Sequence, residues 1–153
     1  ALPFAGCSFD KATCIDVVEN VPDDLSAVSE LQRVLRPNGV LVITTLREDR
    51  RPLVRPVLFI DHLREYRRSE LLRLVESAGL QTVETFEFYR RFATLGWEGQ
   101  YAIMENKWLR RMPGLSSLLW WLFGALAYLD VLSRMPGNGL GMAARKRAKR
   151  KQT

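Results

Sequence analysis

Segment 23–46 constrains the fold of this chain more than any other part of the sequence. Two aspartates at its start supply side-chain oxygens and negative charge for the free N–H groups of a helix, and apolar residues then recur at helical spacing over 23–35. Pro37 ends that helix, and the pair Asn38-Gly39 suits the positive φ angles of a tight turn. The apolar, β-rich run over 40–46 has the composition of a parallel strand covered on both faces.

A second strand is predicted upstream, opening at Phe9-Asp10. Strand, helix and strand then form one right-handed crossover unit of an open α/β sheet. Ligands of such sheets bind beyond the carboxyl ends of the strands, which here are the loops that start at Cys14 and Leu46.

The middle of the chain predicts a further helix and strand. A long loop over 47–61 is polar at first and contains two prolines, and Ser69 is placed to cap the helix that follows. Gly79 suits the left-handed conformation that terminates a helix, and 80–88 alternates as a strand does. The residues of this helix expected to face the sheet are Leu71, Leu72, Leu74 and Val75.

These parts, in their order and spacing, resemble class I S-adenosylmethionine-dependent methyltransferases of the small-molecule, type 11-like branch. The resemblance rests on Leu2-Pro3-Phe4, on Phe9-Asp10, on a helix that closes with Arg33-Val34-Leu35, and on the turn Pro37-Asn38-Gly39. It implies an α/β, Rossmann-like sheet of parallel strands with a final antiparallel strand over 139–146, placed between its neighbours.

The resemblance also implies S-adenosyl-L-methionine as the cofactor. The strand and glycine-rich turn that wrap this cofactor in the family are not in the sequence. We therefore expect the C-terminal half of such a domain, completed by a missing N-terminal half or a partner chain, and poor cofactor binding by these residues alone.

Site residues follow from the resemblance position by position. Ala1 falls at the edge of the adenine-contacting stretch, and Cys14, Ile15 and Val17 line the methionine end of the cofactor, with strand-end packing as the alternative. Many members carry a histidine at the position of Asn20, next to the transferred methyl group. Asparagine can position an acceptor, but it cannot act as a base at neutral pH.

A second group of candidates follows the long loop. His62 is the only histidine, and hence the one side chain that titrates near neutrality without a perturbed pKa. It is predicted either as general base or acceptor-binding group, or as a loop residue bonded to the next helix. Arg64 and Tyr66 are predicted to orient a polar or anionic acceptor, with solvated surface as the alternative for Arg64.

An apolar segment over 115–132 lies inside an expected helical insertion at about 104–134 of a domain over 1–146. It has one charge, Asp130, and arginines flank it. Three interpretations stay open: burial against the sheet or a lipid-like substrate, attachment to a membrane surface, and a membrane span.

The net charge of +6 comes from the C-terminal end, because all seventeen acidic residues lie between Asp10 and Asp130. The basic tail over 147–153 can attract phosphate or be a solvated end. Nucleic acid is disfavoured, because no aromatic residues interleave with these charges. Cys7 and Cys14 lack metal-ligand spacing, so we expect no metal and reduced thiols in a cytoplasmic protein.

The sequence as a whole predicts methyl transfer from S-adenosylmethionine to a small, apolar or lipid-like acceptor, in a protein that is cytoplasmic and potentially in peripheral contact with a membrane. The alternative is a non-catalytic module that keeps the methyltransferase scaffold. Such a module would bind a membrane or a protein partner through the apolar helix and the basic tail.

Overall fold

The computed structural model describes residues 1–48, 63–132 and 136–148, and these form two compact units. The first unit, here the sheet unit, contains residues 1–48, 63–86 and 140–148 of the described chain. The second unit, here the helical unit, contains residues 87–132 and 136–139.

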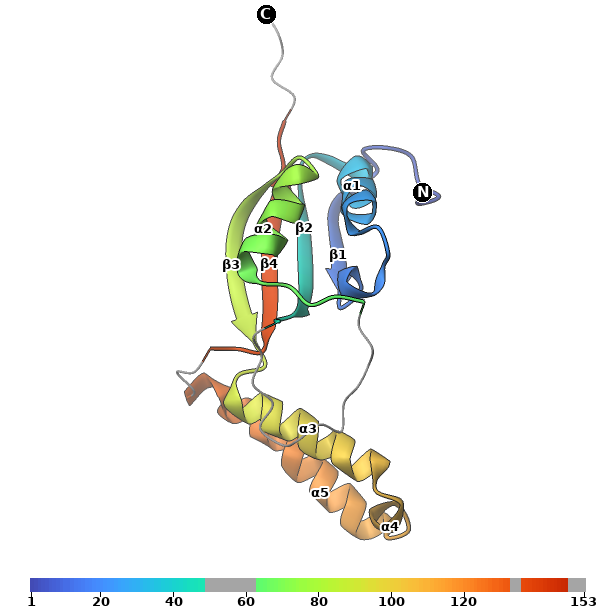
Figure 1. The fold of residues 1–153 in the computed structure, drawn as a ribbon, viewed down its shortest axis with the longest axis vertical. Coiled ribbons are helices and arrows are strands. Elements are labelled where there is room, and N and C mark those ends of the chain that lie inside the picture. The colour runs from blue at the N-terminus through green and yellow to red at the C-terminus, as the bar shows by residue number, and fades with distance from the viewer. Residues whose placement is uncertain (49–62, 133–135, 149–153) are drawn as a thin grey trace, which may run out of the picture. The chain divides into compact units, whose positions relative to one another are not determined.

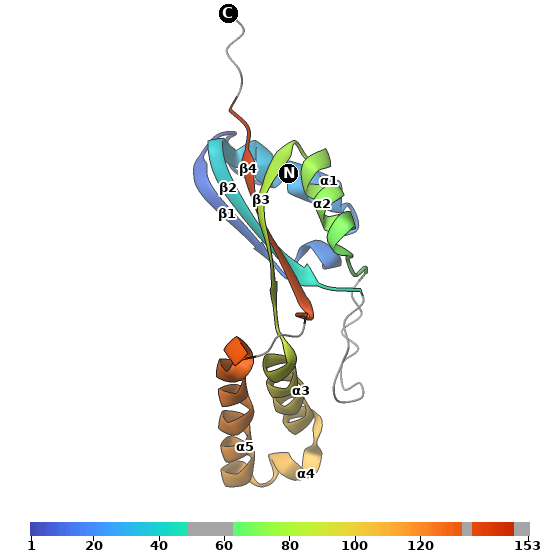
Figure 2. The ribbon, with the colours of Figure 1, turned by 90° about the vertical axis from the view of Figure 1, so that its left-hand side faces the viewer.

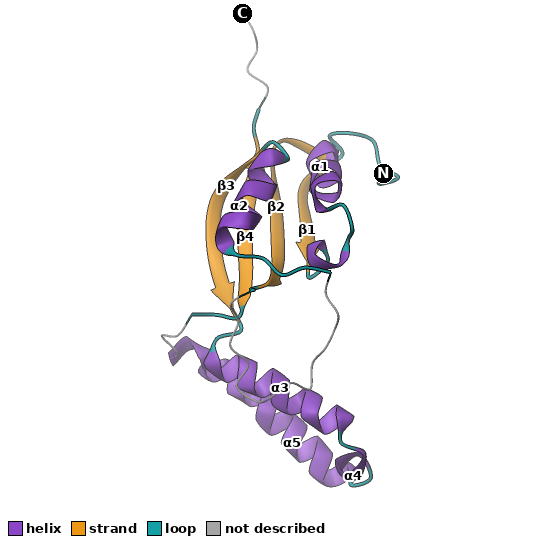
Figure 3. Ribbon diagram, in the orientation of Figure 1, coloured by secondary structure: helices purple, strands orange, loops and turns teal. Residues whose placement is uncertain are grey.

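The sheet unit is built on four strands in the spatial order β1-β2-β4-β3 (Figure 1). β1 and β2 run parallel, with Ala12 opposite Leu41. The chain enters β4 at the end where β3 leaves and continues from its other end toward the C-terminus, so β4 runs antiparallel (Figures 1 and 3). The expected final strand between its neighbours is thus confirmed. The bounds are β1 Phe9–Ile15, β2 Leu35–Leu46, β3 Leu80–Phe88 and β4 Gly139–Lys146.

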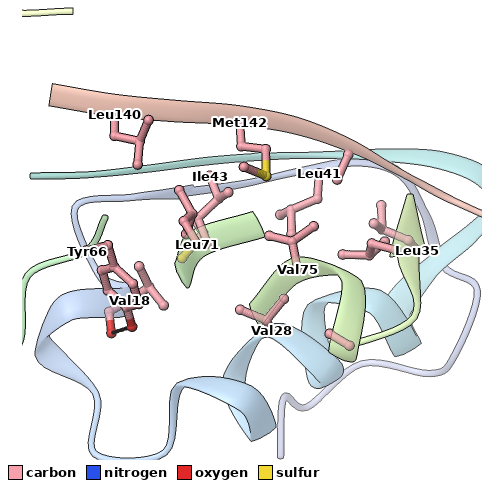
Figure 4. Close-up of a cluster of buried hydrophobic side chains, with 14 residues drawn as sticks. Val18, Val28, Leu35, Leu41, Ile43, Tyr66, Leu71, Val75, Leu140 and Met142 are labelled. Carbon is pink, nitrogen blue, oxygen red and sulfur yellow. Dashed lines mark hydrogen bonds between the residues drawn. The ribbon is translucent and has the colours of Figure 1, made fainter. Parts of the chain in front are cut away.

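Two helices, α1 (Asp24–Val34) and α2 (Arg68–Ser77), cover one face of this sheet (Figure 2). The short 3-10 turn η1 (Val18–Asn20) precedes α1. The core lies between these helices and the sheet, because the apolar faces of both layers are buried there (Figure 4). Its fully buried side chains include Val28, Leu35, Leu41, Ile43, Leu71, Val75, Leu140 and Met142.

The junction of α1 and β2 confirms the predicted helix and corrects the predicted turn. Asp23 caps α1, since its Oδ1 accepts a hydrogen bond from the Ser26 main-chain nitrogen at 2.9 Å. Asn38 has a φ of 67°, whereas Gly39 does not lie in the left-handed region. A Cβ on Gly39 would lie 2.8 Å from the Arg36 carbonyl oxygen and 3.1 Å from that of Asp10. Glycine is needed there because backbone passes close by, not because of its φ angle.

The start of α2 also differs from the prediction, because Ser69 does not cap it. The helix begins at Arg68, so Ser69 already lies in the first turn. The cap comes from Glu70, whose carboxylate accepts a hydrogen bond from the Arg67 main-chain nitrogen at 2.9 Å. At the other end Gly79 has the predicted left-handed conformation, with a φ of 81°.

The helical unit contains α3 (Arg91–Glu105), α4 (Lys107–Arg110), α5 (Pro113–Leu126) and the 3-10 turn η2 (Ala127–Leu132). α3 and α5 approach closely at glycines: a Cβ on Gly96 would lie 2.3 Å from the Phe123 carbonyl oxygen, and one on Gly99 would lie 2.5 Å from the Phe123 ring. α3 was not predicted, because its apolar residues are interrupted by two glycines, Glu98 and Gln100.

The close passage at Gly39 gives a first prediction. Gly39→Ala should lower the free energy of unfolding by about 1–3 kcal/mol, because the added methyl group would crowd two backbone carbonyl oxygens that cannot rotate away. Urea unfolding followed by circular dichroism measures this change. Gly6→Ala is the matched control in the same unit, since a Cβ there meets the Arg33 carbonyl oxygen at an ordinary 3.5 Å. Equal stability of both variants would contradict the prediction.

Candidate functional site at the carboxyl ends of β1 and β2

The chain turns sharply where β1 ends. Asp16 follows the strand with a φ of 51°, a left-handed conformation that costs a non-glycine residue roughly 1–2 kcal/mol. Thr44 of β2 holds it there from both sides: the Asp16 main-chain nitrogen donates to the Thr44 carbonyl at 3.1 Å, and the Thr44 hydroxyl donates to Asp16 Oδ1 at 3.1 Å. Such strain, kept by the surrounding structure, is typical of functional sites.

This turn presents two aliphatic side chains to solvent. Ile15 is 58% exposed and Val17 is 48% exposed, while their neighbour Val18 is buried in the core. Cys14 points the other way, and burial, followed by the charge of Glu19, raises the pKa of its thiol. Of the three predicted cofactor contacts on this strand end, Ile15 and Val17 therefore have accessible side chains and Cys14 does not.

Asn20 ends η1 and is exposed. Its main-chain nitrogen donates to the Val17 carbonyl at 2.9 Å, and its Nδ2 donates to the Asp16 carbonyl at 3.3 Å. Asn20 and Val17 thus belong to one short, internally bonded turn after β1. His62, the other predicted catalytic residue, lies outside the described residues.

Glu19 was not singled out from the sequence, yet it is buried beneath this turn. Its Oε2 accepts a hydrogen bond from the hydroxyl of Thr45 at 3.0 Å, and no described residue donates to its Oε1. The local sequence does not predict this burial, because an acidic residue between Val18 and Asn20 is expected to be exposed to solvent. Burying a carboxylate is costly, so the bond to Thr45 matters for holding η1 on the end of β2.

Arg64 and Tyr66 meet at the beginning of α1, where both bind Asp24. The Tyr66 hydroxyl donates to Asp24 Oδ2 at 2.7 Å, and Arg64 Nη1 lies 2.6 Å from the same oxygen. Arg64 Nη2 also donates to the carbonyl of Pro22 at 2.6 Å. We call these three side chains the Asp24 brace, because they join the segment after the long loop to the helix after η1.

The brace shifts the pKa values of its members. Burial of Asp24 favours the neutral acid, but hydrogen bonds from Tyr66 and Arg64 outweigh it and hold the pKa of this carboxyl below its usual range. Burial, followed by the hydrogen bond to Asp24, raises the pKa of Tyr66 well above its usual value. The Tyr66 hydroxyl therefore stays a protonated donor at neutral pH, and its bond is directed to Asp24.

Ala1 is next to a residue held at the C-terminal end of α1, whereas Asn20 precedes the N-terminal end of that helix. The next residue, Leu2, donates its main-chain nitrogen to Glu30 Oε2 at 2.8 Å and accepts a bond from Arg33 at 3.2 Å, both in the last turns of that helix. The structure brings Asn20, Ile15 and Val17 to one strand end but does not bring Ala1 there. The predicted adenine contact of Ala1 stays a prediction.

Known proteins share both sequence and fold with this chain. Residues 1–43 match the methyltransferase domain family. A ubiquinone biosynthesis O-methyltransferase of Aromatoleum aromaticum is 32% identical over 88 residues, which are 50% of this chain and 38% of that protein. The chain therefore spans about two fifths of the length of such curated relatives.

Solved structures extend the fold match to nearly the whole chain. The cyclase SpnF matches with a TM-score of 0.63 at 18% identity, covering 97% of this chain and 54% of SpnF. A Haemonchus contortus phosphoethanolamine N-methyltransferase, solved with S-adenosyl-L-methionine, matches with a TM-score of 0.60 at 19% identity, covering 95% and 35%.

In sequence over residues 1–43 and in fold over nearly the whole chain, the matches include S-adenosylmethionine-dependent methyltransferases, and the chain corresponds to part of the length of these proteins. The predicted Rossmann-like α/β fold is confirmed. One observation of this chain is consistent with the sulfonium cofactor that such methyltransferases use. Ile15 and Val17 offer exposed apolar surface at the strand end where such sheets bind ligands.

The Asp24 brace gives a second prediction. Tyr66→Phe should lower the free energy of unfolding at neutral pH by about 0.5–1.5 kcal/mol, because Asp24 loses a buried donor. Because the pKa of Asp24 is lower in the folded state, its stabilisation is present above the unfolded pKa of about 3.9 and is lost as pH falls through the folded pKa.

The difference between wild type and Tyr66→Phe should therefore shrink as the pH falls below about 4, as measured by urea unfolding at a series of pH values. Comparing the two proteins at each pH cancels the titration of Glu30, whose own pKa is lowered to about 2 by bonds from Arg33 and the Leu2 nitrogen. A difference that is constant across this range would show that Tyr66 does not act through Asp24.

Proposed function

We propose that the protein containing this chain transfers a methyl group from S-adenosylmethionine to an oxygen atom of a small, apolar acceptor. The family match over residues 1–43 and relatives named as O-methyltransferases of ubiquinone biosynthesis support this function. Those names also favour an enzyme over a non-catalytic module. The cyclase among the structural matches shows that the fold alone does not define the reaction.

The observation that carries the proposal is the strained turn after β1, with exposed Val17 and Asn20 held at the carboxyl end of the sheet. When bound, the cofactor supplies an electrophilic methyl group on a sulfonium. Ile15 and Val17 would exclude water around this group. Methyl transfer needs donor and acceptor aligned at close range, and a turn held in place by Thr44 would support such an alignment.

Asn20 is proposed to orient the acceptor, because its amide can donate and accept hydrogen bonds but does not take up a proton near neutral pH. If the acceptor hydroxyl must lose its proton, another group has to accept it. His62 remains the proposed base on sequence grounds. The proposed roles of Arg64 and Tyr66 toward the acceptor are indirect, because the side chains of the Asp24 brace already bind each other.

The third prediction tests the division of roles between neighbouring residues. Asn20→Ala should lower kcat by roughly 10–100-fold while cofactor affinity stays within a few-fold, because this amide orients the acceptor and not the cofactor. Val17→Asp should instead weaken cofactor binding, since it places a charge on the proposed apolar contact. Turnover of a labelled methyl group into an apolar phenol and calorimetry with S-adenosylhomocysteine measure the two effects.

These measurements use the protein in which the chain occurs, and Val83→Ser, an exposed change on β3, serves as control. Equal loss of cofactor affinity in Asn20→Ala and Val17→Asp would mean that the turn acts as one structural support. Full turnover in both variants would reject the proposed site.

A further inference from the structure

The outer face of α5 and η2 is an apolar surface that the helical unit leaves uncovered. Trp121 is 77% exposed, Tyr128 is 85% exposed, and no residue of α5 or η2 is buried. An apolar surface of this extent on a soluble protein marks an interaction site. We define the outer face by its exposed members, Leu115, Leu118, Trp121, Leu122, Tyr128, Val131 and Leu132.

The opposite side of α5 is already occupied by α3. Phe123 packs against the two α3 glycines, and Gln100 Nε2 donates to the carbonyl of Trp120 at 2.9 Å. Five residues of α3 are buried, whereas no residue of α5 is. The outer face is therefore not a surface on which α3 could pack after a small shift.

Positive charge lies at one end of this face. Lys107, Arg110 and Arg111 come immediately before α5, and no acidic residue occurs between Glu105 and Asp130. The segment Pro113–Leu132 is long and apolar enough to cross a membrane by length and composition, and none of its residues is buried.

The one acidic residue of the segment is used inside the unit. The Asp130 carboxylate accepts hydrogen bonds from the main-chain nitrogens of Arg90, Phe92 and Ala93 at 2.7, 2.9 and 3.0 Å. It thereby caps α3, whose first turn has no acidic residue of its own. A charged residue such as Asp130 disfavours contact with lipid. In the structure, however, its carboxylate is directed toward α3, so the charge does not interrupt the outer face.

We propose that the outer face binds the surface of a membrane that contains anionic lipids, with α5 lying in the plane of the interface. Apolar side chains would enter the acyl boundary, the aromatic rings of Trp121 and Tyr128 would lie among the headgroups, and the three cations would meet lipid phosphates. A helix lying flat keeps α3, with its Arg91 and Glu105, on the aqueous side. This arrangement matches the one-sided apolar surface better than a span does.

The inference stands apart from the proposed methyl transfer, because binding to vesicles is measured without cofactor or acceptor. If both hold, the enzyme would meet an apolar acceptor where such molecules dissolve. Failure of one leaves the other intact.

The experiment is co-sedimentation of the protein with vesicles of phosphatidylcholine, with and without phosphatidylglycerol. Binding should require the anionic lipid and weaken as salt is raised, because screening reduces the charge contribution. The double variant Trp121→Ser with Leu122→Ser should bind about tenfold or more weakly. Replacing Lys107, Arg110 and Arg111 by Gln should remove the preference for anionic vesicles.

Val83→Ser, which removes an exposed aliphatic side chain on β3, is the matched control and should bind like wild type. Far-UV circular dichroism verifies that all variants fold. Absence of vesicle binding by the wild type, or unchanged binding by the double variant, would overturn the proposal. So would dimerisation without vesicles that is abolished by the double variant, since the outer face would then bind a second copy. Quenching of tryptophan fluorescence by lipids brominated at the bilayer centre would show that the segment spans the membrane, and would overturn the flat orientation.

Discussion

The hydrogen bonds of Lys146 join parts of the sheet unit that lie more than a hundred residues apart in the sequence. Its Nζ donates to the main-chain carbonyls of Gln32 at 2.8 Å, Arg33 at 3.3 Å and Leu35 at 2.7 Å. Gln32 and Arg33 lie in the last turn of α1, where carbonyls lack intrahelical partners and a cation is favoured, and Leu35 follows as the first residue of β2. This contact sets the position of β4 along its own strand direction. The buried side chains of Leu140 and Met142 hold the strand against the core. The order of the strands, and with it the position of the strand ends of the candidate site, depends on this placement of β4 between β2 and β3.

The parts of the fold that were predictable are those whose signal is local. Asp23 at the start of α1 and Gly79 at the end of α2 act as their residue types suggest. Ser69 and Gly39 show the limit of such reasoning. A capping residue can be replaced by a better placed acceptor such as Glu70, and a glycine can be required by a neighbouring strand that only the fold brings close.

For the candidate site, the sequence could predict a region of the fold but not the contacts within it. A resemblance to a family located the turn after β1, and the structure shows Val17 and Asn20 there. The Asp24 brace joins residues 42 positions apart, and no periodicity or spacing indicates such a pairing. The burial of Glu19 and the capping of α3 by Asp130 escaped prediction for the same reason, because isolated acidic residues are expected in solvent.

The position of β4 in the sheet also affects how the protein can fold during synthesis on the ribosome. β2 and β3 emerge early, yet the strand that pairs with both is separated from β3 by the whole helical unit. Until residues 139–146 have been translated, the inner edges of β2 and β3 are without their native partner and open to association with other chains. The helical unit makes its own internal contacts between α3 and α5, so it can fold during this delay. A chaperone that shields exposed strand edges would thus act mainly while 89–138 are being made.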